Sequence, residues 1–194
     1  MQRSFLVLAL GMLFSASALA QNAASETRRD TNQQNHVEQG LKSGQLTTKE
    51  AGTLERDEQR IDRTQAHAMK DGTLSAQEAA RIQREQNQAS RQIYQDKHNT
   101  VAGNPNSRSS ERMQADVQRN ANQQARINRG VESGRLNNHE AGALERGQAH
   151  VDRSEANAAR NGRVGAREQA RTQGRENRQS GRVYRKKHNA KTGG

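Results

Sequence analysis

The sequence predicts an all-α protein that is a tandem duplication of a small three-helix unit, a helical hairpin with one short helix added. Three observations lead to this fold class. The chain contains an internal repeat, helix-capping motifs recur at regular intervals, and no segment shows the apolar–polar alternation of a strand. Large apolar residues are sparse, so each unit should have only a marginal core.

The internal repeat has no gaps. Residues 31–100 align with 121–190 at a constant offset of 90; one matching pair is Glu50-Ala51-Gly52 and Glu140-Ala141-Gly142. Pro105, the only proline, lies between the copies among Gly, Asn and Ser residues, which favours a flexible linker. The expected organisation is a signal peptide (1–20), unit 1 (21–99), a flexible linker (100–110), unit 2 (111–190) and a tail (191–194).

A shorter motif marks the helix junctions inside each unit. In unit 1, Gly44 and Gly72 are placed to end a helix in the left-handed conformation. Thr47 and Ser75 then cap the next helix, and a glutamate three residues later completes a capping box. The fourth junction is eroded, because Gly165 occupies the capping position. These motifs predict helices over 27–42, 48–70 and 76–97, repeated in unit 2.

The middle helix of unit 1 has a thin apolar stripe. Ala51, Leu54, Ile61 and Ala68 lie on core-type spacing, interrupted by Glu58 and Gln65. Carboxylates interleave with Arg and Lys along the helices, which predicts ion pairs on the surface. Because a core this thin offers almost no burial, no perturbed general acid or base is expected.

The N-terminus has the pattern of a cleavable signal peptide. A positive start at Arg3 precedes an apolar run from Phe5 to Phe14, and Ala18-Leu19-Ala20 forms a small-residue cleavage site. Cleavage is expected after Ala20, with export to the periplasm or the medium. The rest of the chain contains no other apolar run, so the processed protein should not be transmembrane.

The composition argues against an enzyme. No cysteine is present, no serine lies in a nucleophile-elbow context, and no glycine-rich phosphate loop follows a strand. No cofactor and no catalytic residue is therefore expected.

Two features suggest metal binding only weakly. Asp71, Gly72, Leu74, Ser75 and Glu78 resemble the second half of an EF-hand loop, but loop positions one and three are His67 and Met69. The six histidines are scattered, with no pair at the helical spacing that chelates one ion. Capping explains the loop residues equally well, so no metal site is assigned.

The two units differ sharply in charge. Residues 31–99 carry ten basic and ten acidic side chains, whereas residues 121–190 carry fifteen and seven. Much of the excess follows a helical spacing of three and four. We call these seven residues the arginine stripe: Arg163, Arg167, Arg171, Arg175, Arg178, Arg182 and Arg185. At about 100° per residue they occupy a sector of about 120°.

The arginine stripe, with Lys186 and Lys187, is the expected binding site. Arginines on one face repel one another, and an anionic partner relieves that repulsion. The chain is thus expected to be a non-enzymatic exported protein that binds lipopolysaccharide, acidic polysaccharide, extracellular DNA or anionic lipid, without sequence-specific nucleic-acid recognition. One alternative is a merely solvated face. The other is a periplasmic cation-binding or metal-stress protein that uses the EF-hand-like loops and the histidines.

The second unit also carries the residues of a recurrent pattern, R-I-x-x-G-x-x-S-G-x-L. They are Arg126-Ile127, Gly130 and Ser133-Gly134-Arg135-Leu136, and the first copy has His36-Val37 in place of Arg-Ile. In this the chain resembles small, basic, uncharacterised secreted bacterial proteins with helical repeats. The resemblance spans both units and implies no particular activity.

Overall fold

The computed structural model of the protein describes residues 15–189 and contains only helices within that range. The helices are α1 (Ser15–Ser43), α2 (Thr48–Ala68), α3 (Ala76–Lys97), α4 (Arg108–Glu132), α5 (Asn138–Ala158) and α6 (Ala166–Lys187). The all-α class is therefore confirmed. α3 has the predicted bounds, α2 ends two residues early, and α1 begins well before residue 27. The early start adds buried packing, because Ala23 and Ala24 join the core.

The helix junctions form as the capping motifs predicted. The four glycines at these junctions, Gly44, Gly72, Gly134 and Gly162, all have positive φ angles. The Glu50 amide N–H donates to the Thr47 hydroxyl over 3.1 Å, and the Thr47 N–H donates to the Glu50 carboxylate over 2.9 Å. At the eroded junction only the second bond is possible, from the Gly165 N–H to Glu168. Local chemistry thus sets where most helices begin.

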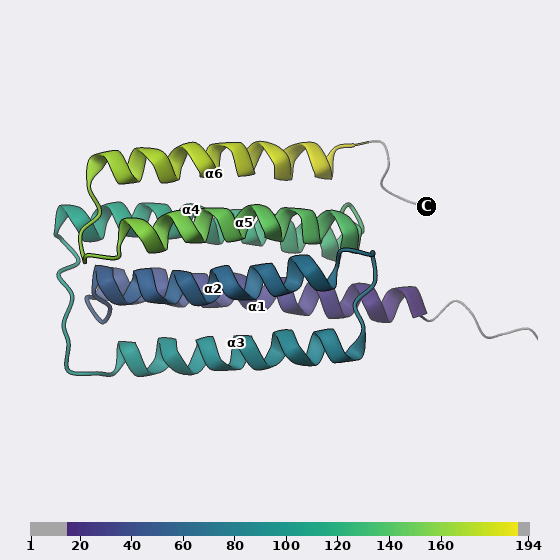
Figure 1. Ribbon diagram of the computed structural model, residues 1–194, viewed down its shortest axis with the longest axis horizontal. Coiled ribbons are helices and arrows are strands. Elements are labelled where there is room, and N and C mark those ends of the chain that lie inside the picture. The colour runs from purple at the N-terminus through teal and green to yellow at the C-terminus, as the bar shows by residue number, and fades with distance from the viewer. Residues whose placement is uncertain (1–14, 190–194) are drawn as a thin grey trace, which may run out of the picture.

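The helices lie side by side in layers (Figure 1). α1, α2, α4 and α5 form a four-helix bundle, and α3 and α6 flank it on opposite sides. The largest interfaces join α2 to α5 and α1 to α4, so the two repeat units share one core. α4 begins at Arg108, inside the predicted linker, and the Gly103 N–H donates to the Gly44 carbonyl over 2.8 Å.

Two equivalent glycines allow α2 and α5 to pack closely. A Cβ atom on Gly52 would lie 2.5 Å from the Ala159 Cβ atom, and one on Gly142 would lie 2.9 Å from the Met69 Cβ atom. Neither separation is possible between real carbon atoms, so a side chain at either position would push the helices apart. The Glu-Ala-Gly motif therefore serves the interface between the two units.

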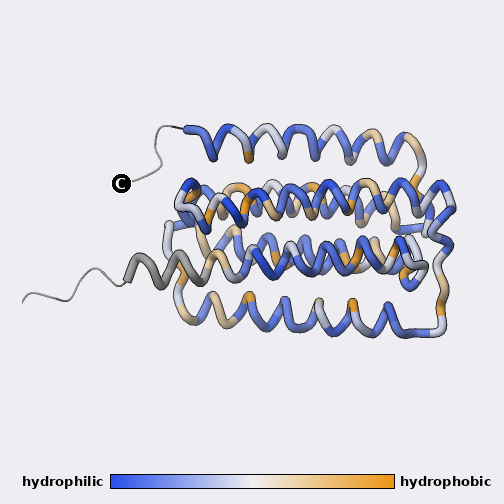
Figure 2. The backbone as a smooth tube through the Cα atoms, turned by 180° about the vertical axis from the view of Figure 1, so that it is seen from behind, coloured by the Kyte–Doolittle hydropathy of each residue, from blue (hydrophilic) through white to orange (hydrophobic). Residues whose placement is uncertain are grey.

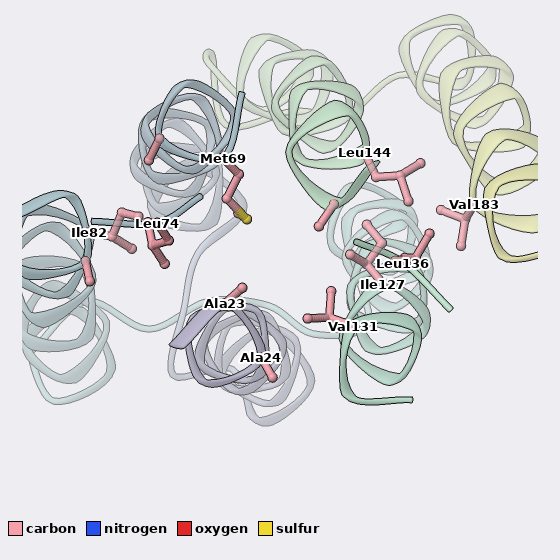
Figure 3. Packing of buried hydrophobic residues seen from close by; sticks show 13 residues of the cluster. Ala23, Ala24, Met69, Leu74, Ile82, Ile127, Val131, Leu136, Leu144 and Val183 are labelled. Carbon is pink, nitrogen blue, oxygen red and sulfur yellow. The ribbon is translucent and has the colours of Figure 1, made fainter. Parts of the chain in front are cut away.

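The apolar core is divided between the two ends of the bundle. One cluster includes Met69, Leu74, Ile127 and Leu144, which point inward from different segments (Figure 3). The other includes Leu41, Leu54 and Met113. Hydrophilic residues occupy most of every helix, and hydrophobic ones are interspersed (Figure 2). The space between the two clusters is consequently filled largely by polar side chains.

The predicted apolar segment of the signal peptide, Phe5–Phe14, lies outside the described residues. Among those that are described, no helix has the length and hydrophobicity to cross a membrane. Cleavage after Ala20 would fall within α1, which begins at Ser15.

Candidate functional site

The arginine stripe lies on the outer face of the molecule. Arg163 precedes α6, the other six arginines lie along it, and all seven are exposed. In the described part of the chain none of the seven is within ion-pair distance of a carboxylate. Their charges are thus neutralised only by solvent ions or by a ligand.

Part of the arginine stripe lines a groove between α5 and α6. One cavity of about 630 Å³ has Arg171, Arg175 and Arg178 on the α6 side. A second, of about 640 Å³, has Arg182, Arg185 and Lys186 on that side. His150 of α5 lines both, so the two cavities adjoin, and together we call them the α5–α6 groove.

The opposite wall of this groove was not predicted from the sequence. Arg146, His150 and Arg153 of α5 face the arginines of α6. Their spacing of four and three is the same helical signal as in the stripe, but only the packing of α5 on α6 shows that the two faces meet. Burial, followed by the charges of Arg175, Arg63, Arg182 and Arg153, lowers the pKa of His150.

Three predicted residues lie outside the groove, and the charge of a fourth is partly offset. Arg163 and Arg167 line neither of its cavities. The Lys187 ammonium group donates to the Arg126 carbonyl over 3.1 Å. Burial, with Arg129, Arg126 and Arg135 nearby, lowers the pKa of Lys187. Lys186 also lies 3.7 Å from Glu140, which offsets part of its charge.

A smaller groove of about 450 Å³ lies between α2 and α3 in unit 1. It is lined by Arg56, Arg60, Arg63 and Arg81. Two of these are already paired, because Arg60 contacts Asp57 over 2.5 Å and Arg81 contacts Glu85 over 3.1 Å. The α5–α6 groove therefore presents more uncompensated positive charge.

The EF-hand-like loops are occupied by local hydrogen bonds. Asp71 accepts from the Thr73 amide over 2.9 Å and from its hydroxyl over 2.8 Å, and these bonds lower the pKa of Asp71. Glu78 accepts from the Ser75 N–H over 3.0 Å as part of a capping box. These are the contacts of a helix junction, and they use the oxygens that a cation would need.

The histidines are exposed and separate from one another. His98 and His188 stack on Tyr94 and Tyr184. His139 contacts the Lys70 carbonyl over 2.7 Å through its Nδ1 atom. Among the described residues, no histidine belongs to a group with metal-ligand geometry.

The prediction of surface ion pairs was wrong for a set of acidic residues in the middle of the bundle. Seven carboxylates, each at most 3% exposed, come from α1, α2 and α5 and lie between the two apolar clusters. We call them the buried carboxylate layer: Asp30, Glu55, Glu58, Asp62, Glu145, Asp152 and Glu155. Within the described range, no lysine or arginine is buried beside them. The premise that the core offers no burial to an acid was also wrong; the absence of enzymatic activity stays a prediction.

Six members of this layer form two groups of three. Asp30, Asp62 and Glu145 offer oxygen atoms that all lie within 4.8 Å of one another. Glu55, Asp152 and Glu155 do the same. Each triad draws on both repeat units, so it exists only because the units pack together.

Amide side chains surround both triads. The Gln65 amide donates to Asp30 over 2.7 Å, and Gln34 donates to Glu55 over 3.0 Å. In the other unit Asn120 donates to Asp152 over 2.7 Å, and Gln124 donates to Glu145 over 2.9 Å. These amides supply hydrogen bonds but no positive charge.

Burial is the first cause of the raised pKa values in the layer. It raises the pKa of Asp30 to about 7, although Gln65, Gln86 and Gln124 donate to it. It likewise raises the pKa of Glu55 to about 7. Burial and neighbouring carboxylates raise the pKa values of Glu58, Asp62 and the three acids of α5 well above their usual range.

The sequence did contain a signal for this layer. Glu58 and Gln65 interrupt the apolar stripe of α2 at positions that otherwise face the core. A polar residue at a core position is the informative observation, because an isolated polar group is costly to bury.

Comparison with known protein families, curated protein sequences and solved structures found no match for the chain.

Proposed function

We propose that this is a non-enzymatic exported protein that binds anionic polymers or envelope surfaces through unit 2. The observation that carries the proposal is the α5–α6 groove, where cationic side chains from two helices face one another. Phosphate, sulfate and carboxylate groups are the ligands that guanidinium side chains bind best. A groove with two basic walls holds a linear polyanion better than a single exposed face does.

The dimensions of the groove suit a polymer. α6 has 22 residues, and at 1.5 Å per residue such a helix is about 33 Å long. Its basic residues are distributed along this length, so one chain of anionic groups can contact several of them. Binding of this kind releases counterions and reads charge spacing rather than sequence.

The discriminating experiment removes charge from the groove without changing the net charge relative to a control. The groove variant carries Arg171→Gln, Arg175→Gln, Arg178→Gln and Arg182→Gln. The control variant carries Arg84→Gln, Arg91→Gln, Arg108→Gln and Arg160→Gln, at four exposed arginines outside the groove. Affinity is measured for lipopolysaccharide, a polyuronate and duplex DNA across a salt series.

We expect the groove variant to have at least tenfold lower affinity than the control variant for whichever polymer the wild-type protein binds. The slope of log affinity against log salt should also fall by several units on duplex DNA, since each phosphate contact contributes about 0.9. Equal affinities of the two variants would show that net charge alone attracts the polymer. The three polymers separate phosphate ligands from carboxylate ligands.

Export is a separate part of the proposal, and it rests on the N-terminal sequence pattern. Protein recovered from the periplasm or the medium should have the intact mass of a chain that begins at Gln21. A mass that retains residues 1–20 would contradict cleavage after Ala20.

A further inference from the structure

The buried carboxylate layer poses an electrostatic problem that the fold alone does not solve. Seven acids lie between two apolar clusters without a buried lysine or arginine in the described range. Transfer of an unpaired carboxylate from water to an apolar interior costs several kcal/mol, so buried acids take up protons or bind cations. The question is which of the two the geometry favours.

Each triad has the size of a single cation site. Its three oxygen atoms lie within 4.8 Å of one another. Calcium binds oxygen at about 2.3–2.6 Å, so two oxygens on opposite sides of one calcium ion are separated by about 4.6–5.2 Å. All the oxygens of a triad can therefore touch the same ion.

Each repeat contributes three carboxylates to the triads, although their positions differ between the repeats. In unit 1 the acid is Asp30 and its amide partner is Gln65; in unit 2 the equivalent residues are Asn120 and Glu155. The acid and the amide have exchanged places, and each triad still contains three carboxylates. If these side chains served only to form hydrogen bonds, amides could replace more of the carboxylates. A bound cation, in contrast, requires the negative charge of the carboxylates.

Glu58 provides an independent observation. Its side chain is 2% exposed, and neither carboxylate oxygen has a hydrogen-bond partner. The charges that act on it most strongly are those of Asp30, Glu55 and Asp152, which belong to the two triads. Gln148, its counterpart in unit 2, is also buried and leaves its Oε1 atom without a partner. Both side chains have free oxygen atoms beside the acids.

We propose that the buried carboxylate layer is a two-cation site, with one hard metal ion in each triad and with Glu58 as a further ligand. Calcium is the divalent ion that fits this set best, and a trivalent lanthanide ion of similar size balances the three charges of a triad. The site is distinct from the anion-binding groove and uses neither the EF-hand-like loops nor the histidines.

The ligand set also defines which ions should bind weakly. Magnesium demands near-octahedral geometry at about 2.1 Å and gives up its water reluctantly, so a dry site suits it poorly. Zinc and copper prefer nitrogen and sulfur ligands, which the layer does not contain. Because the layer is inaccessible to solvent, an ion enters during folding or a transient opening of the bundle, and loading should be slow.

The test measures metal content and stability together. The purified protein is unfolded with chelator and refolded in calcium, terbium or magnesium, and bound metal is determined after dialysis. We expect two calcium or terbium ions per chain and a rise in melting temperature of roughly 5–10 °C at a large excess of metal. Magnesium should give a much smaller rise.

Isosteric variants locate the ions. Glu145→Gln removes one acid from one triad and should lower the content from two ions to one. Asp62→Asn with Asp152→Asn should abolish binding, yet this variant should be more stable than the wild type in chelator because two buried charges are removed. Asp71→Asn, in the exposed EF-hand-like loop, is the matched control and should bind two ions.

Each result supports or overturns the inference. Metal-free protein after refolding in calcium and terbium, with an unchanged melting temperature, would overturn it. So would ions that remain in the Asp62→Asn/Asp152→Asn variant, because they would then be bound elsewhere. Loss of metal in Asp71→Asn would place the ions in the loops. None of these results depends on polyanion binding, which the groove variant tests separately.

Discussion

Asp62 and Asp152, which occupy the same position in the two repeats, are in hydrogen-bonding contact across the interface between α2 and α5. Burial is the main cause of their raised pKa values, and each also interacts with carboxylates of the other unit. The duplicated sequence thus brings the same acid together with its own copy, in the way that a two-fold axis does in a symmetric dimer.

The metal-free protein should lose stability as the pH rises. Asp116 and Glu176 illustrate the cause, since burial raises the pKa of Asp116 from 3.8 to about 7 and that of Glu176 from 4.5 to about 8. The positive charge of Arg119 lowers both pKa values and so opposes the effect of burial. The charge of Glu55 further raises the pKa of Asp116, and the charge of Asp116 further raises the pKa of Glu176. The folded state holds these protons more tightly, so their stabilisation is complete at low pH and disappears as the pH rises through the folded values.

Urea unfolding in chelator should therefore give a smaller free energy at about pH 8 than at about pH 5, by at most about 1.4 kcal/mol per pH unit for each group. Glu176→Gln, which restores the residue of unit 1 (Gln86), should reduce this pH dependence and stabilise the protein at the higher pH. A free energy of unfolding that increases with pH would show that these acids are charged in the folded protein.

Close packing of α2 on α5 should make Gly52 intolerant of substitution. Gly52→Ala places a methyl group 2.5 Å from that of Ala159, so we expect a loss of roughly 1–3 kcal/mol in the free energy of unfolding. Gly174→Ala is the matched control, because its Cβ atom would lie 3.7 Å from the flexible end of Arg178. There the higher helix propensity of alanine should stabilise the protein by up to about 1 kcal/mol. If the two substitutions changed the free energy of unfolding in the same direction, the close approach of α2 to α5 at Gly52 would be contradicted.

The helix caps provide a second matched pair. Ser75→Ala removes the acceptor for the Glu78 amide, which is 3.3 Å from the Ser75 hydroxyl, and should cost about 1 kcal/mol in chemical unfolding. Gly165→Ser adds the missing cap to α6, where Gly165 already has the extended conformation of an N-cap. That change should stabilise the protein by a few tenths of a kcal/mol. If Ser75→Ala has no effect, the capping box contributes nothing to stability.

The helix junctions could be predicted from the sequence because their causes are local. Gly44 ends α1 with a positive φ angle, and Thr47 starts α2 by accepting a hydrogen bond from the Glu50 amide. The partner of each helix depends on packing between distant residues, so the shared core of the two units did not follow from the repeat. A glutamate such as Glu58 has the same sequence signature on a surface and in a polar core; only its place in the apolar stripe distinguishes the two.

The candidate site divides in the same way. The arginine stripe could be predicted, because seven residues at helical spacing share a face whatever that helix packs against. The second wall of the α5–α6 groove could not, since Arg146 and Arg153 line the groove only because α6 lies beside α5. The two carboxylate triads require α1, α2 and α5 to face one another, so the polar residues in the stripe of α2 indicate buried acids but not how the acids are grouped.

Each repeat unit should depend on the other for its helical structure. The largest interfaces, α1 with α4 and α2 with α5, all cross from one unit to the other. Fragments 21–102 and 103–194 should therefore each be poorly helical alone and should gain helicity when they are mixed in equal amounts. Circular dichroism and analytical ultracentrifugation of the single and mixed fragments provide the measurement.

Self-association is the control, because unit 1 can place a second copy of itself where unit 2 lies. The mixture should nevertheless favour the heterodimer, because Arg28 of unit 1 forms an ion pair with Glu132 of unit 2, whereas a homodimer of unit 1 would place Lys42 at the equivalent position. A homodimer of 103–194 would bring its basic α6 helices into one particle and add repulsion. Fully helical, monomeric fragments with no change on mixing would show that each unit folds by itself, and the shared core would then be dispensable.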